Sequence, residues 1–170
     1  MPYHEVVPLL LTASPGELCC RPYHNHRRGC PNYGKRATCP PQAKRWNGQY
    51  VLYHYFVAVW SFYPFAEHVK RMRTKHPDWT QRQLECCLYW QGTARKALRS
   101  EIKTFLSSLS ADDRKRASVH EVPEAHGVNV TATMRRLDVM IEWPPCEYVC
   151  HVALVVFPHN NTLRSWRSTP

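Results

Sequence analysis

The sequence has no apolar run long enough to cross a membrane. A transmembrane helix needs roughly 18 or more consecutive residues with few or no charges, and no segment approaches that length. The first residues, 1–18, also lack the basic start and continuous apolar stretch of a secretory signal. These absences predict a protein without a membrane interaction that resides in the cytoplasm.

The signature motifs of several common enzyme classes are missing as well. The chain contains no G-x-G-x-x-G, no P-loop, no H-E-x-x-H and no G-x-S-x-G. Dinucleotide binding, phosphate-loop chemistry, zinc-dependent proteolysis and serine hydrolysis are therefore not indicated. Whether the protein is an enzyme stays open at this point.

Acidic side chains are scarce relative to basic ones. The chain has 23 Lys and Arg against 13 Asp and Glu, a formal net charge of +10. Such an excess attracts phosphate-bearing partners, so nucleic acid is one candidate. The basic residues are spread along the whole chain, however, and solubility explains the excess equally well.

Cysteine, in contrast, is abundant, with eight residues in 170. Thiols in the cytoplasm stay reduced, so these side chains are expected to be ligands or buried groups rather than disulfides. The adjacent pairs Cys19-Cys20 and Cys86-Cys87 agree with this interpretation, because a disulfide between neighbouring residues is strained.

Four of the eight cysteines lie in one short stretch, "CCRPYHNHRRGCPNYGKRATCPP", which runs from Cys19 to Pro41 and contains no carboxylate. The surrounding segment, residues 12–48, is too rich in proline, glycine and charge to build an apolar core. A structureless loop of this length is uncommon inside a compact domain. We therefore predict that a metal site orders this loop.

The types of ligand and their spacing favour an iron-sulfur cluster over zinc. Cys20, Cys30 and Cys39 are widely spaced, which suits thiolates placed around a bulky cluster, with a 4Fe-4S cluster the leading candidate. No short C-x-x-C knuckle of the usual zinc type is present. Zinc stays an alternative, bound by these three cysteines and either His24 or His26.

The stretch "NHRRGCPNYGKRATCPP", from Asn25 to Pro41, resembles the signature of a family of small, cysteine-rich, uncharacterised prokaryotic proteins described as predicted metal-binding proteins. A second segment, Glu124 to Trp143, is similar to another block of that family. The resemblance implies that Cys30 and Cys39 are metal ligands and that Cys19 or Cys20 is the upstream one. A further cysteine-rich block common in the family is absent here.

The hydrophobic pattern predicts an α+β fold, a small mixed sheet packed by a long helix. Strands are expected over Gln49 to Trp60, "DVMIEW" and "EYVCHVALVVF", with the first and last apolar on both faces and therefore central. Helices are expected after Pro64, from Gln81 to Leu109, and around Val130 to Leu137. We predict a single domain over 1–170, with the metal-binding loop at 12–48 and the α+β core at 49–157.

The fourth ligand of the predicted site is assigned to Cys87. On the helical pattern Cys87 lies on the apolar stripe, one turn before Gln91, and this face is expected to turn toward the loop. A buried, inert thiol is the plainer alternative for Cys87. Other candidates for the fourth position are Cys19, Cys86, Cys146 or a histidine, and an iron left open for substrate is a further alternative. Cys150 alternates with strand residues and is expected to pack.

Three functions fit the sequence. The first is an iron-sulfur protein in electron transfer or in a reductive or sulfur-handling reaction, with an unknown redox partner or small-molecule substrate. The second is a zinc-stabilised basic module that binds single-stranded nucleic acid, with Tyr23, Tyr33 and Trp46 as stacking aromatics. The third is a metal-free interaction protein whose cysteines only pack.

Overall fold

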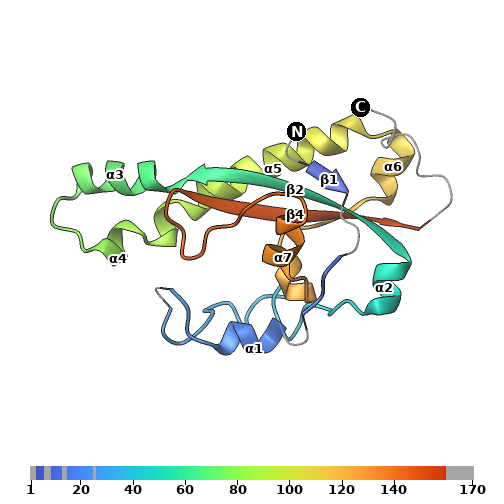
Figure 1. The fold of residues 1–170 in the computed structure, drawn as a ribbon, viewed down its shortest axis with the longest axis horizontal. Helices are drawn as coiled ribbons and strands as arrows, with labels where there is room; N and C mark the ends of the chain where they lie inside the picture. Colours follow the sequence, from blue (N-terminus) through green and yellow to red (C-terminus); the bar gives the residue numbers. More distant parts are fainter. Residues whose placement is uncertain (1–2, 6–8, 13–14, 25, 160–170) are drawn as a thin grey trace.

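The computed structural model describes residues 3–5, 9–12, 15–24 and 26–159. Its centre is a sheet of four strands in the order β1-β2-β4-β3: β1 (Tyr3–Glu5), β2 (His54–Pro64), β4 (Tyr148–Pro158) and β3 (Ser118–His120). All three strand pairs are antiparallel. The sheet is therefore antiparallel and not mixed, in contrast to the expectation from the sequence. The predicted α+β class, with a helix packed on the sheet, is confirmed (Figure 1).

The two central strands are the two that the sequence identified as apolar on both faces. β2 and β4 pair along their full lengths, from His54 opposite Pro158 to Pro64 opposite Tyr148. The outer strands β1 and β3 have three residues each and were not predicted. Strands this short carry too little pattern to be recognised from periodicity.

The long helix α5 (Gln91–Ser108) covers one face of the sheet. Side chains that alternate along the strands meet the buried stripe of α5 in one apolar cluster: Val57, Val59, Ala153, Val155 and Phe157 with Leu98, Ile102, Phe105 and Leu109. The stripe at helical spacing was visible in the sequence, and its contact with the sheet accounts for much of the core.

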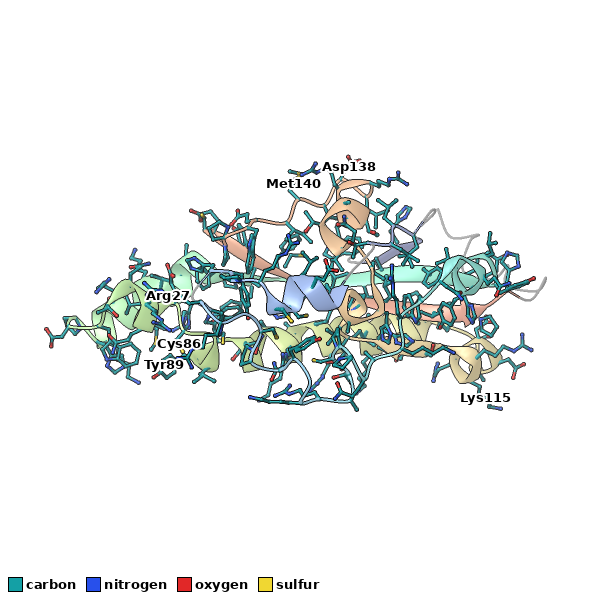
Figure 2. The ribbon with its side chains drawn as sticks, turned by 90° about the horizontal axis from the view of Figure 1, so that it is seen from below. Arg27, Cys86, Tyr89, Lys115, Asp138 and Met140 are labelled. Atoms are coloured by element: carbon teal, nitrogen blue, oxygen red, sulfur yellow. The ribbon has the colours of Figure 1, made fainter. Side chains whose placement is uncertain are left out.

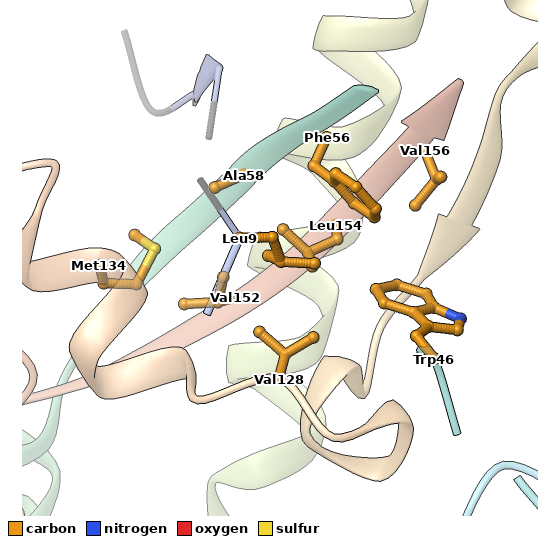
Figure 3. Close-up of a cluster of buried hydrophobic side chains, with 9 residues drawn as sticks. All are labelled: Leu9, Trp46, Phe56, Ala58, Val128, Met134, Val152, Leu154 and Val156. Atoms are coloured by element: carbon orange, nitrogen blue, oxygen red, sulfur yellow. The ribbon is translucent and has the colours of Figure 1, made fainter. Parts of the chain in front are cut away.

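The opposite face carries a second apolar cluster beneath α7 (Val130–Arg135). Its members come from distant segments of the chain and are drawn in Figure 3: Leu9, Trp46, Phe56, Ala58, Val128, Met134, Val152, Leu154 and Val156. The cysteine-rich segment, which begins with α1 (Pro15–Cys20), lies beyond α7 on this side (Figure 1). The order of layers is therefore α5, the sheet, and then α7 with the cysteine-rich segment.

A third cluster closes one end of the sheet. Tyr63 and Phe65 at the junction of β2 with α3 (Phe65–Lys75) pack against Trp90 and Ala94. Here the predicted helix 81–109 is wrong, because it is interrupted. α4 (Gln81–Leu84) starts with the predicted Thr80–Gln83 capping box, the 3-10 turn η1 (Cys87–Tyr89) follows, and α5 begins only at Gln91.

The interruption has a local cause at Trp90. Its indole N–H donates to the carbonyl of Glu85 at 3.1 Å while its ring packs into the third cluster. This placement is incompatible with a continuous helix, and Cys86 takes an extended backbone conformation instead. Cys87 therefore lies in a tight turn rather than on the stripe of a long helix.

Two further predictions differ from the structure. The strand expected to begin at Gln49 starts at His54, because Asn47 caps α2 (Gly48–Leu52) by accepting the Tyr50 amide N–H. The segment "DVMIEW" is not a strand. Its apolar residues Val139 and Ile141 instead pack against the second cluster.

The remaining elements are short. They are α6 (Ala111–Arg116), which leads into β3, and the 3-10 turn η2 (Pro123–His126), which precedes α7. None of the helices in the described part of the chain has the length and apolar character required to cross a membrane. The expectation of one domain stays a prediction.

Candidate metal centre

The cysteine-rich segment folds back on itself immediately after α1. The amide N–H of Cys30 donates to the carbonyl of Cys19 at 2.7 Å. Gly29 makes this contact possible, since its φ is +76° and a Cβ at this position would lie 2.5 Å from the Cys19 carbonyl oxygen. A side chain would collide with backbone there, so glycine is required. The turn thus places Cys30 beside the end of α1.

A second set of turns returns the chain from Cys30 to Cys39. The amide of Tyr33 donates to the Cys30 carbonyl at 3.2 Å, and that of Cys39 donates to Arg36 at 3.0 Å. Gly34, with a φ of +70°, donates its amide to the Pro40 carbonyl at 2.9 Å. Hydrogen bonds and glycine turns, rather than apolar burial, therefore shape this part of the loop.

The thiol of Cys19 lies close to the other thiols of the loop. Burial raises the pKa of Cys19, and the negative charges of Cys30, Cys39 and Cys20 thiolates raise it further. An influence of this kind requires short separations, because charge interactions weaken with distance and screening. Three of the predicted ligands are therefore neighbours of Cys19.

The structure distinguishes the two adjacent cysteines of α1. Cys19 is half-buried, whereas Cys20 is exposed. A hydrogen bond between the Tyr33 hydroxyl and Cys20 raises the pKa of Tyr33. The exposed Cys20 thiol thus faces the Tyr33 hydroxyl at the surface. Cys19 is the member of the pair better placed to join Cys30 and Cys39.

Tyr23 links the loop to Cys87. Burial and then the charges of Cys30 and Cys87 thiolates raise the pKa of Tyr23 to about 12. Burial also raises the pKa of the Cys87 thiol. One tyrosine side chain therefore lies within electrostatic reach of thiols from both parts of the predicted site.

The loop is also fastened to the segment just before η1. His24 Nε2 lies 2.9 Å from the Glu85 carboxylate. His26 stacks on the Tyr23 ring with centroids 4.7 Å apart, and paired backbone hydrogen bonds join the same two residues. The two histidines offered as alternative ligands thus have contacts of their own, with a carboxylate and an aromatic ring.

These thiols do not converge on a point. Within the described ranges, no three His, Cys, Asp or Glu side chains are close enough together to hold a single metal ion as they stand. A zinc ion requires sulfur ligands at about 2.3 Å from the metal. That Cys87 shares one metal site with Cys30 and Cys39 stays a prediction.

The other cysteines have different surroundings. Cys146 is exposed in the loop before β4, and Cys86 is half-buried beside Cys87. Cys150 packs against the second apolar cluster, and burial raises its pKa to about 12. The expectation that Cys150 packs is confirmed.

Both ends of the loop are attached to one segment that the sequence analysis did not single out for this role. The amide of Thr12 donates to Gly127 at 2.7 Å, and that of Trp46 donates to His126 at 3.0 Å. His126 Nδ1 donates to the Lys44 carbonyl at 2.7 Å. Residues 126–127 thus close the loop at its base.

A histidine pair extends this attachment to the sheet. His126 donates through Nδ1, so its Nε2 accepts from Nδ1 of His120, on β3, at 3.1 Å. The Trp46 ring stacks on His126 with centroids 4.7 Å apart. No periodicity or spacing in the sequence reveals such a pair, because it depends on the packing of three distant segments.

Trp46 itself corrects one prediction. It is only 4% exposed and belongs to the second apolar cluster (Figure 3), so it does not offer a stacking surface to nucleic acid. Of the other two proposed aromatics, Tyr23 is half-buried, and only Tyr33 is exposed. The aromatic part of that alternative is therefore weakened.

The second of the two segments that carry the family resemblance lies near residues just before the first one. Glu124 is close enough to Cys19 for its charge to raise the pKa of that thiol. Trp143 lies near the Tyr23 ring, with centroids 6.2 Å apart. Comparisons of the chain with protein-family models, with curated proteins and with solved structures find no significant match. The resemblance stays a prediction.

Proposed function

We propose that the protein binds an iron-sulfur cluster through Cys19, Cys30, Cys39 and Cys87 and acts in electron transfer or in a reductive or sulfur-handling reaction. The observation that supports this most directly is a pair of contacts made by the loop: the Cys30 amide donates to the Cys19 carbonyl at 2.7 Å, and His24 Nε2 lies 2.9 Å from the Glu85 carboxylate. These contacts attach the loop that carries Cys30 both to α1 and to the segment just before Cys87.

The chemistry of the donor set fits such a group. Thiolates are soft ligands that suit iron-sulfur clusters, and a cluster holds them farther apart than a single ion does. The thiols here are neighbours without converging on one point. Cys19 replaces Cys20 in the proposed set because Cys20 is exposed and bonded to Tyr33.

The charge of the loop also supports a cluster rather than a neutral site. The segment from Cys19 to Pro41 carries basic side chains and no carboxylate, and a cluster with four thiolates is negatively charged. Hydrogen bonds to the sulfurs are a recognised means of tuning such a group. Tyr23 places a hydroxyl near Cys30.

The test is metal and sulfide analysis of protein purified without oxygen. A four-iron cluster predicts about four iron and four sulfide per chain and a broad absorption near about 400 nm. Serine at Cys30 or Cys39 should abolish both signals, and serine at Cys19 or Cys87 should lower iron content and broaden or shift the absorption.

The matched controls are Cys20→Ser and Cys150→Ser, since the first thiol is bonded to Tyr33 and the second packs in the core. Both should retain the metal. Stoichiometric zinc without sulfide would replace the cluster by the zinc alternative. Unchanged metal content in both the Cys30 and the Cys39 variant would reject the thiol site altogether.

A further inference from the structure

The surface next to Cys87 is apolar at its centre. Leu88 and Tyr89 in η1 are 84% and 53% exposed, and Leu88 is the most exposed of the large hydrophobic side chains described. The Tyr89 ring is supported by Trp79, with centroids 5.1 Å apart. Tyrosine is enriched in protein interfaces and among their energetically important residues, and Leu88 extends the exposed apolar surface next to Tyr89.

Basic side chains lie at the same end of the molecule as this apolar centre. Arg27 and Arg28 are exposed on the turn that follows His24, which is joined to Glu85 just before η1. Figure 2 shows Arg27, Cys86 and Tyr89 at one end of the molecule and Lys115 at the other. We call Arg27, Arg28, Leu88 and Tyr89 together the loop–η1 surface.

Few carboxylates offset the positive charge there. The chain has no Asp or Glu between Glu17 and Glu67. Glu85, the carboxylate nearest to η1 in sequence, accepts hydrogen bonds from Gln81 and contacts His24. Asp78 is the other carboxylate of the neighbouring turn. The loop–η1 surface thus combines arginine with an apolar centre.

We propose that the loop–η1 surface is a docking site for an acidic protein. Arginine with aromatic and aliphatic side chains is the composition of protein interfaces, and the charge selects a partner rich in Asp and Glu. Single-stranded nucleic acid fits less well, because successive bases stack on several open aromatic rings. Of the four residues of the loop–η1 surface only Tyr89 is aromatic, and the most exposed apolar group is Leu88.

This proposal does not depend on a metal. It does place the partner beside Cys87, one of the proposed ligands, since Leu88 follows Cys87 in η1. An acidic redox protein bound there would be next to a proposed ligand, which gives the exposed leucine a function.

The experiment uses defined probes with the full-length protein. One is a 16-residue peptide of four Glu-Glu-Leu-Phe repeats, the second a 16-residue polyglutamate, and the third a 16-nucleotide oligothymidylate. Affinities are measured by calorimetry at one low ionic strength. The wild type should bind the Leu-Phe peptide more tightly than either other probe.

Two double variants, each of which removes two positive charges, distinguish binding at a local site from binding driven by net charge. Arg27→Ala with Arg28→Ala should weaken the Leu-Phe peptide about tenfold, because charge pairs at an interface are lost. Lys115→Ala with Arg116→Ala removes two exposed charges on α6 at the far end and should have an effect of less than about twofold. Leu88→Ser should lower the peptide's affinity to that of polyglutamate.

Three results would overturn the proposal. Equal losses in the two double variants would assign binding to net charge, and tighter binding of oligothymidylate with the same dependence on Arg27 and Arg28 would make the surface a nucleic-acid site. No binding of the Leu-Phe peptide at low salt would remove it. Metal analysis of the Arg27→Ala with Arg28→Ala variant keeps this test distinct from that of the metal, since its metal content should equal that of the wild type while its peptide affinity falls.

Discussion

Two regions of the molecule are stabilised by different forces. One is the sheet with α5, and the other is the cysteine-rich loop. In the sheet, Val57, Val155 and Phe157 are fully buried, and each such side chain contributes about 1.5–3 kcal/mol by leaving water. The loop depends on turns and hydrogen bonds, such as the one from Cys30 to Cys19, each worth about 1 kcal/mol net. The loop is therefore expected to open before the sheet does.

The difference also indicates which of the two regions can hold a functional site. Apolar burial is not directional and tolerates little change, whereas a loop shaped by specific turns can present side chains to a ligand. The thiols of Cys19, Cys30 and Cys39 lie in the second kind of structure. A ligand that binds only the closed loop would stabilise it in proportion to its affinity.

The largest expected effect comes from opening a cavity under α5. Phe105 is 1% exposed and its ring is 4.8 Å from that of Tyr3. Phe105→Ala should lower the free energy of unfolding by about 3–5 kcal/mol, because transfer and cavity costs add. Chemical denaturation followed by circular dichroism measures this, with the exposed Lys103→Ala as control. A loss below about 1 kcal/mol would contradict the proposed core.

An intermediate effect is expected in the loop from Gly29→Ala. The new Cβ would lie 2.5 Å from the Cys19 carbonyl oxygen at a φ of +76°, so the hydrogen bond from Cys30 to Cys19 should break. Gly34→Ala is the matched control, since its φ is +70° but no atom lies within 4 Å of the added Cβ. The control should lose only about 1–2 kcal/mol of local stability from the left-handed backbone.

The measurement is amide hydrogen exchange across both regions. Gly29→Ala should increase exchange at Cys30 and through the loop while the amides of β2 and β4 keep their protection. If the two glycine variants behave alike, the close approach of Gly29 to α1 does not stabilise the loop. If the strands also lose protection, the two regions are not separable.

The smallest effect concerns pH and the base of the loop. Burial and then the charge of His126 lower the pKa of His120 from 6.5 to about 4. The folded protein therefore binds this proton less readily than the unfolded chain. The contribution of His120 to stability is complete above about pH 6.5 and decreases as the pH falls toward about 4.

Urea denaturation of the wild type and of His120→Gln across this pH range checks the sign. Glutamine retains hydrogen-bonding capacity but does not titrate, so the stability of the variant should depend less on pH between about 6.5 and about 4. The direct measurement is an NMR titration of the His120 ring. A midpoint near 6.5 would contradict the buried pairing with His126.

The α+β class, the central position of β2 and β4, the helices after Pro64 and near Val130, and the capping box at Thr80 follow from the sequence alone. Each depends on local pattern: alternation, helical spacing, or a cap and its partner three residues later. The same patterns favoured a continuous helix over 81–109, because apolar spacing persists through the break at Trp90.

Tertiary structure decided what local pattern could not. The ring of Trp90 packs against Tyr63 and Phe65 at the end of the sheet, and Val139 and Ile141 cover the sheet instead of joining it. The half-burial of Cys19 next to the exposed Cys20 and the pair of His120 with His126 belong to the same class. Sequence spacing fixes which side chains a segment carries, but distances between segments far apart in the chain are set only when the apolar faces of the sheet, α5 and α7 are buried together.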